Sequence, residues 1–202
     1  MTTPAAQVCA VLQPAVAEAA RLAGAGSVGL VDVAGGAPGT DANLHPDAVL
    51  TTYGDESTLG DVASSVRLRC RLVGGRGVSA TPVPTVVSRE AVPVEGDLGT
   101  GLAAAVGRVP GDALAVVLTT WALSRLWPGR RPAFLRALED AASGSPAAWV
   151  SVEGVGVAPG VPTLGDRPAS GHSLVGLHLV GGSAPPRVLA RCWSRGAVLS
   201  WL

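Results

Sequence analysis

The chain has 202 residues, with 15 basic and 15 acidic side chains and a formal net charge of zero. Hydrophobic residues make up 48% and charged residues 15%, which excludes a disordered chain and predicts a single domain spanning residues 1–202. The sequence has one phenylalanine and one tyrosine and no basic excess. We therefore expect no nucleic-acid partner, because both a cationic field and aromatic stacking surfaces are scarce.

The sequence also argues against secretion and membrane insertion. No positively charged segment precedes the first apolar residues, as a secretory signal would require. The longest apolar run, residues 113–118, is far below the ~20 residues of a membrane-spanning helix. Three scattered cysteines without a CxxC pair are typical of buried thiols in a reducing compartment: Cys9, Cys70 and Cys192. We expect a soluble, cytoplasmic protein without a metal site.

Apolar residues at helical spacing predict three helices. Residues 8–23 are rich in alanine, and Pro14 is expected to split or restart their helix. Residues 98–106 predict a short helix. Residues 131–142 predict an amphipathic helix with Pro132 in its first turn.

Buried and alternating runs predict the strands. Residues 28–34 and 113–120 are apolar on both faces, as in buried parallel strands. Residues 66–73 alternate, which predicts a half-buried strand near an edge with its arginines on one side. Residues 35–61 show little pattern. Further strands are expected at residues 83–94 (with a turn), 147–153, 173–180, 187–193 and 197–202, and the short turns in the tail predict an antiparallel end to an open α/β sheet.

The stretch "VGLVDVAGGAPGTDANL" contains the first candidate binding site. Open α/β sheets bind ligands at the carboxyl ends of strands, near the point where the strand order reverses. A strand that ends in Asp32 fits such a site, and so do three glycines that permit close backbone approach: Gly35, Gly36 and Gly39. The pattern GxGxxG is absent and Pro38 removes an amide donor, so a plain turn is the alternative.

Polar residues at two other strand ends form the second candidate. Glu153 ends one predicted strand, and Thr119, Thr120 and Trp121 end another. In a parallel sheet these groups lie along the same edge as Asp32, and a partly buried carboxylate there has a perturbed pKa that suits catalysis. The alternative is a structural carboxylate that caps a turn or pairs with an arginine, such as Arg89, Arg130 or Arg167.

A serine hydrolase is a third interpretation. The segment "GHSLVG" is similar to a nucleophile elbow, with Ser173 as nucleophile and His178 as the base that follows it. The segment carries one residue too many before its last glycine.

Several segments together resemble a known family. "VGLVDVAGGAPGTDANL", "VRLRCRLVGG", "VVSREAVPV" and "ALAVVLTTWALSRLWPGRRPAFLRAL" occur in that order, and the run of residues 149–177 and the closing "RGAVLSWL" are the most specific parts. The set resembles the bacterial domain-of-unknown-function family DUF2332, in an actinobacterial form, over nearly the whole chain.

The resemblance implies a class I methyltransferase fold, which is a Rossmann-like, mostly parallel α/β sheet with helices on both faces and antiparallel C-terminal strands. It implies S-adenosylmethionine as the cofactor, with the glycine loop at its methionine end and Asp32 orienting its ammonium group. Thr120 and Trp121 would lie on the substrate side, and Glu153 would be the local base. The substrate stays open.

Two departures from the family pattern favour an alternative function. Ala34 and Pro38 interrupt the loop pattern, and the aspartate expected to hold the ribose is absent from "REAVPV". The alternative is a degenerate, non-catalytic Rossmann-like protein that acts through protein contacts. Family members also carry a helical N-terminal region ahead of the part that begins here with "TTPAAQ". We expect either a small-molecule substrate or a partner subunit at the edge that such a region would cover.

Overall fold

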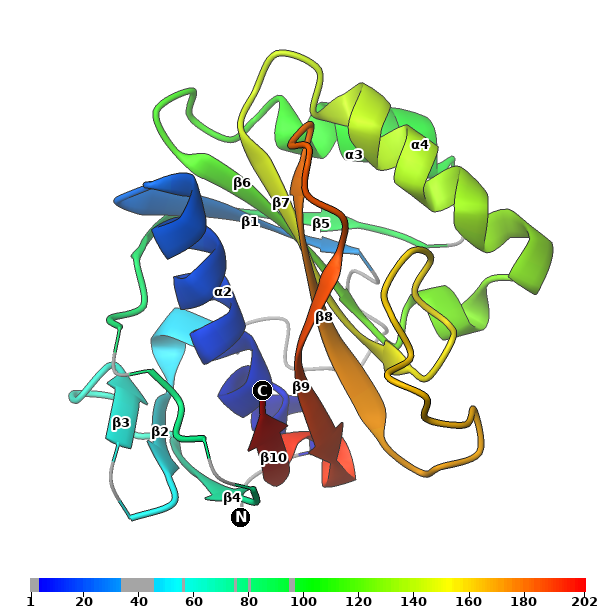
Figure 1. Cartoon of the computed structure of the whole chain (residues 1–202). Coiled ribbons are helices and arrows are strands. Elements are labelled where there is room, and N and C mark those ends of the chain that lie inside the picture. The colour runs from blue at the N-terminus through cyan, green and yellow to red at the C-terminus, as the bar shows by residue number, and fades with distance from the viewer. Residues whose placement is uncertain (1–3, 34–45, 56, 75, 80, 95–96) are drawn as a thin grey trace.

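The computed structural model describes residues 4–33, 46–55, 57–74, 76–79, 81–94 and 97–202. Ten strands form one sheet in the order β3-β2-β4-β10-β9-β8-β7-β6-β1-β5 (Figure 1). The strands are β1 (Ser27–Val33), β2 (Leu50–Tyr53), β3 (Ser57–Gly60), β4 (Arg67–Leu72), β5 (Thr85–Val92), β6 (Leu114–Thr120), β7 (Ala147–Gly154), β8 (Ser173–Val180), β9 (Arg187–Trp193) and β10 (Val198–Trp201). The α-helices are α1 (Pro4–Gln7), α2 (Cys9–Ala23), α3 (Leu98–Val106) and α4 (Arg131–Ala141).

The sheet is mixed and mostly parallel. β5, β1, β6 and β7 run parallel to one another. β8, β9 and β10 follow with the expected antiparallel pairing, but they lie in the middle of the sheet and not at its end. β10 then pairs in parallel with β4, and the sheet continues into β2 and β3. The predicted α/β class is therefore confirmed.

Helices cover both faces of the sheet (Figure 1). Successive side chains of a strand point to opposite faces, so each buried strand contributes to two apolar cores. In β1, Leu30 belongs to the core around α2, whereas Val31 and Val33 belong to the core under α3 and α4. Phe134 of α4 packs against Trp149 of β7, with ring centroids 5.3 Å apart.

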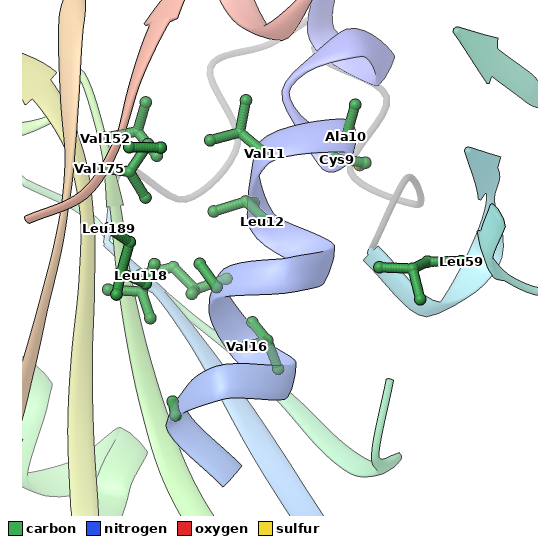
Figure 2. Packing of buried hydrophobic residues seen from close by; sticks show 14 of the residues in the cluster. Cys9, Ala10, Val11, Leu12, Val16, Leu59, Leu118, Val152, Val175 and Leu189 are labelled. Atoms are coloured by element: carbon green, nitrogen blue, oxygen red, sulfur yellow. The ribbon is translucent and has the colours of Figure 1, made fainter. Parts of the chain in front are cut away.

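Helix α2 is enclosed on more than one side. Val11 and Leu12 point towards Val152 and Val175 of the sheet, and Leu59 of β3 lies on the other side of the helix (Figure 2). The helix runs unbroken through Pro14, so the expected split at this proline is wrong. The Ala10 carbonyl, which in a regular helix would accept the N–H of residue 14, accepts the Tyr53 hydroxyl of β2 instead.

Two glycines allow valine side chains from neighbouring segments to pack directly on the strand backbone. An added Cβ at Gly29 of β1 would lie 2.6 Å from Val109, and one at Gly176 of β8 would lie 2.8 Å from Val161. Both valines can therefore approach the sheet directly, because no side chain stands between them and the strand backbone.

Two local expectations need correction, and two others are met. The described part of residues 35–61 holds β2 and β3, which the sequence pattern did not reveal. β4 has the expected alternating burial and is the third strand from the β3 edge, between β2 and β10. β5 runs through without a turn and is itself an edge strand. The expected burial of the cysteines is confirmed, since Cys9, Cys70 and Cys192 are all buried and form no disulfide.

Within the described residues, no helix combines the length and the apolar character needed to cross a bilayer.

Candidate functional site

The order of the parallel strands reverses beside β1. From β1 the chain passes to β5 on one side and later to β6 and β7 on the other side. The carboxyl ends of β1 and β6 therefore flank the position at which open α/β sheets bind ligands. Parallel neighbouring strands are usually connected through an α-helix. The described part of the connection between β1 and β5 contains the strands β2, β3 and β4 instead.

Asp32 lies at this switch point. It is one residue from the end of β1, opposite Leu118 of β6 and Ala91 of β5. Burial raises the pKa of its carboxyl group, and its charge contributes to the raised pKa of the nearby Cys9 thiol. No cationic side chain among the described residues pairs with Asp32. The three glycines of the predicted cofactor loop lie outside the described residues: Gly35, Gly36 and Gly39.

Thr120 and Trp121 lie at the end of the neighbouring strand. Thr120 is half-buried and lies opposite Val152 of β7. Trp121 has φ of +54°, a left-handed conformation that is costly for a bulky residue. Its indole Nε1 donates a 2.9 Å hydrogen bond to Ser173 Oγ, and the guanidinium carbon of Arg195 lies 5.9 Å from the ring centroid. These contacts hold Trp121 in place at the carboxyl edge.

Glu153 is buried, with 1% of its surface exposed. Its Oε1 accepts a 2.9 Å hydrogen bond from the backbone N–H of Leu123, the first residue of the 3₁₀ turn Leu123–Arg125. Its Oε2 has no hydrogen-bond partner among the described residues. Desolvation raises the pKa of Glu153 to about 7, although backbone N–H groups of this turn and the charge of Arg131 oppose the shift. The geometry is that of a carboxylate that caps a turn.

The carboxylates of Asp32 and Glu153 lie at the same edge of the sheet but on opposite faces. Asp32 is on the same face of β1 as Leu30, which faces α2. Glu153 is on the same face of β7 as Trp149, which faces α3 and α4. Trp149 Nε1 donates to Thr119 Oγ1 at 3.0 Å on that face. Asp32 and Thr120 therefore share a face on neighbouring strands, and Glu153 lies on the opposite face.

The connection from β6 to α4 forms a pocket that the sequence analysis missed. A cavity of about 480 Å³ is lined by Val94, Arg125, Leu126, Trp127 and Arg130. The Trp127 side chain is strongly exposed, at 78%. A groove of about 750 Å³ between α3 and α4 adjoins this pocket and shares Val94, Leu126 and Arg130 with it. The available signal was the "RLWPGRR" stretch, in which three arginines surround an apolar pair.

A polar cluster occupies the loop before β8. Arg191 Nε donates a 2.6 Å hydrogen bond to Asp166 Oδ2, and His172 Nε2 lies 3.0 Å from the same oxygen. Arg191 and His172 together lower the pKa of Asp166. His172 also packs against Trp193, with ring centroids 5.2 Å apart. These contacts tie the loop to β9.

The nucleophile-elbow interpretation finds no support here. Ser173 is the first residue of a regular strand, and its Oγ accepts the Trp121 hydrogen bond. His178 is five residues further along the same strand, about 17 Å away at the usual rise. No group of three or more metal-ligating side chains gathers anywhere in the described chain.

Comparison with protein-family models gives a match. A protein-family model described as "Uncharacterized protein conserved in bacteria (DUF2332)" matches residues 91–201, more than half of the chain. No curated protein and no solved structure matches this chain. The matched range begins at the end of β5 and runs into β10, so it includes Glu153 and the Trp127 pocket and leaves out Asp32.

Proposed function

The chain belongs to the DUF2332 family, and we propose that it is a methyltransferase-like protein that binds S-adenosylmethionine or a similar nucleoside at the carboxyl ends of β1 and β6. The observation that carries the proposal is the position of Asp32. A half-buried carboxylate without a described cationic partner lies at the switch point of a parallel sheet. A ligand ammonium or hydroxyl group would satisfy it, because a buried charge is costly unless it is paired.

The fit to the cofactor is good at one end and weak at the other. Asp32 suits the ammonium group of the methionine portion. At the neighbouring strand, β5 ends in Val92, which is buried and apolar, where a carboxylate for the ribose hydroxyls would be expected. The protein would therefore hold the ligand chiefly through its methionine end.

The residues of this chain would act by positioning. When bound, S-adenosylmethionine supplies an electrophilic methyl group. Thr120, the last residue of the strand next to Asp32, and Trp121, which follows it, would orient an acceptor towards the methyl group. The fixed Trp121 ring would exclude water from that side. Alignment of two reactants in one site can accelerate a reaction greatly without acid–base chemistry.

A second candidate function is a non-catalytic protein that acts through protein contacts. It is favoured by the placement of Glu153, the expected base. Glu153 lies on the opposite face from Asp32 and is hydrogen-bonded to the Leu123 amide. A site that had lost its chemistry could keep such a carboxylate for structural reasons alone.

Thermal unfolding with S-adenosylhomocysteine tests the proposal. Ligand at 100 times its Kd stabilises the folded state by ~2.7 kcal/mol, which should raise Tm by about 5–11 °C for a chain of this size. Asp32→Asn should remove that shift. Asp112→Asn is the matched control, because Asp112 is an exposed acidic residue ahead of β6, at the amino edge of the sheet.

The outcomes separate the two candidates. A shift that Asp32→Asn removes and Asp112→Asn retains supports the binding site, and the search would move to methyl acceptors. No shift at millimolar ligand would overturn the proposal and favour the non-catalytic protein. An equal shift in the Asp32→Asn variant would mean that the ligand binds elsewhere.

A further inference from the structure

We propose that three arginines of β4 form a docking surface for an extended acidic segment of a partner protein. This surface, the arginine face, consists of Arg67, Arg69 and Arg71. It lies on the side of the sheet away from α2, whereas Asp32 lies on the α2 side. The proposal therefore stands whether or not the chain binds an adenosyl ligand.

The alternation of β4 leaves the arginine face exposed. Leu68 and Cys70 are buried in the core around α2, so the arginines that alternate with them point away from that core, and all three are exposed. The second core, under α3 and α4, contains no described residue of β2, β3, β4 or β10. Figure 1 shows α3 and α4 over another part of the sheet, away from β2, β3 and β4. No described helix therefore covers the arginine face.

The three guanidinium groups are unpaired. The ion pairs among the described residues include none of them. Arg67 donates a 3.5 Å hydrogen bond to the carbonyl oxygen of Val62, which carries no charge. Asp166, a carboxylate beside β9 on the same side of the sheet, is already bound by Arg191 and His172. The arginine face therefore presents three positive charges to solvent without a described counter-charge.

Two further carboxylates lie at the ends of β3, which β2 separates from β4. Asp55 precedes β3 and Asp61 follows it. Neighbouring strands are ~4.8 Å apart, so two spacings place β3 about 10 Å from β4, beyond the ~8 Å Debye length at physiological ionic strength. Asp61 Oδ1 also accepts a 2.8 Å hydrogen bond from the N–H of Ala63. These carboxylates therefore flank the arginine face and do not neutralise it.

The spacing of the arginines matches an extended chain with acidic residues at alternate positions. Same-face side chains of a strand repeat every ~6.7 Å, so Arg67, Arg69 and Arg71 form a row with that period. An extended partner that lies along β4 has the same period, and each of three carboxylates can meet one guanidinium group. A guanidinium group binds both oxygens of a carboxylate through two parallel N–H groups, which fixes the register of the partner.

The residues around the arginines favour a protein segment over a nucleic acid or a membrane. Thr52 lies opposite Arg69, and Thr58 lies beyond Thr52 on β3. On the other side of β4, Val198 lies opposite Arg71. The described part of this face on β2, β3, β4 and β10 has no aromatic side chain on which bases could stack. It also has no exposed leucine, phenylalanine or tryptophan that could enter a bilayer.

Arginine side-chain signals test the proposal on the full chain. In the ¹⁵N-labelled protein, Arg69→Gln identifies the Arg69 Nε–H signal by its loss. The probe is a capped peptide in which three glutamates alternate with threonines, since threonine favours extended chains. At low ionic strength we expect this alternating peptide to shift the Arg69 signal saturably, and added salt should weaken the binding.

Other anionic probes separate the alternatives. A spaced peptide, whose three glutamates are each separated by three threonines, keeps the charge and loses the period. It should bind about two- to fivefold more weakly, because only two of its carboxylates can reach the arginine row at once. A thymidine tetranucleotide, with three phosphate charges, should also bind more weakly than the alternating peptide. Vesicles of equal parts phosphatidylserine and phosphatidylcholine should not sediment the protein.

A matched pair of double variants provides the control. Arg69→Gln/Arg71→Gln should weaken binding of the alternating peptide about fourfold to 25-fold, since each exposed ion pair contributes about two- to fivefold. Arg108→Gln/Arg136→Gln removes the same charge from two exposed positions, one after α3 and one in α4, and should leave the affinity unchanged. Equal binding of the spaced peptide, tighter binding of the tetranucleotide, sedimentation with vesicles, an equal loss in the control variant, or no saturable shift would each overturn the proposal.

Discussion

The hydroxyl group of Tyr53 donates a 2.7 Å hydrogen bond to the carbonyl oxygen of Ala10. In a regular helix that carbonyl would accept the N–H of residue 14, four positions later, but Pro14 has none. A side chain of β2 thus replaces the missing donor of α2. This is why the helix continues through a proline that the sequence pattern marks as a break.

Tyr53→Phe should therefore destabilise the protein through α2. The substitution leaves the buried Ala10 carbonyl without its donor and also removes the 3.1 Å bond from the hydroxyl to Gln13 Oε1. We expect a loss of about 1–3 kcal/mol in the free energy of unfolding, measured by urea denaturation.

A second variant separates this mechanism from a general packing effect. Pro14→Ala restores an N–H that can bind the Ala10 carbonyl. The cost of Tyr53→Phe should then be smaller in the Pro14→Ala background than in the native chain. Strictly additive costs in the double variant would contradict this account of α2.

The raised pKa of Glu153 makes the stability depend on pH. Burial raises this pKa from 4.5 to about 7, so between these values the folded protein holds a proton that the unfolded chain has released. The contribution of Glu153 is therefore greatest at low pH, falls as the pH rises from about 4.5 to 7, and is constant above that range.

Glu153→Gln isolates this effect. The amide keeps a carbonyl oxygen for the Leu123 N–H but does not titrate. Between pH 5 and pH 8, the unfolding free energy of the native chain should fall by about 2–3 kcal/mol more than that of the variant. The comparison uses urea titrations at both pH values, and parallel pH profiles for the two proteins would rule out a titrating Glu153.

Gly176 is expected to tolerate no side chain. A Cβ at this position would lie 2.5 Å from Ser151 Oγ and 2.8 Å from Val161. Gly176→Ala should destabilise the protein by about 1–3 kcal/mol through overpacking, as measured by a lower denaturation midpoint. Gly26→Ala is the control, since nothing lies within 4 Å of a Cβ there.

The close approach of Gly176 to Ser151 Oγ predicts a second substitution that relieves the overpacking. Ser151 Oγ is buried without a hydrogen-bond partner among the described residues, so Ser151→Ala removes an atom that stabilises little. In that background Gly176→Ala should cost less. An unchanged cost would place the obstruction at Val161 alone.

Strong local patterns predicted most of the parallel half of the sheet. β1, β6 and β7 are long apolar runs, and the observed bounds differ from the expected ones by one residue. β2 and β3 have four residues each and were missed, because so short a segment has too few alternations to reveal a period. The pairing of β4 with β10 joins residues far apart in the chain, which no local pattern encodes.

The site was partly predictable for a related reason. Strand ends located Asp32, Thr120 and Glu153 at one edge, because parallel strands end on the same side. The strand ends do not tell which face of the sheet each side chain occupies, because that depends on how the strands are placed in the sheet. The placement of Glu153 and Asp32 on opposite faces was therefore visible only in the structure. The Trp127 pocket lies in a connection without periodicity, where local sequence gives turns but not their relative placement.

The enclosure of α2 also has a consequence for biosynthesis. Glu18 of this helix bonds to Arg187 at 2.5 Å, across a separation of 169 residues, and Gln7 Nε2 donates to the Gly196 carbonyl at 3.2 Å. At a translation rate of ~5–20 residues per second, these partners leave the ribosome about 10–30 s after the helix. Throughout that interval the valines at positions 11 and 16 lack the strands that later bury them. The apolar face of this helix therefore stays without its partners until nearly the whole chain has been synthesised.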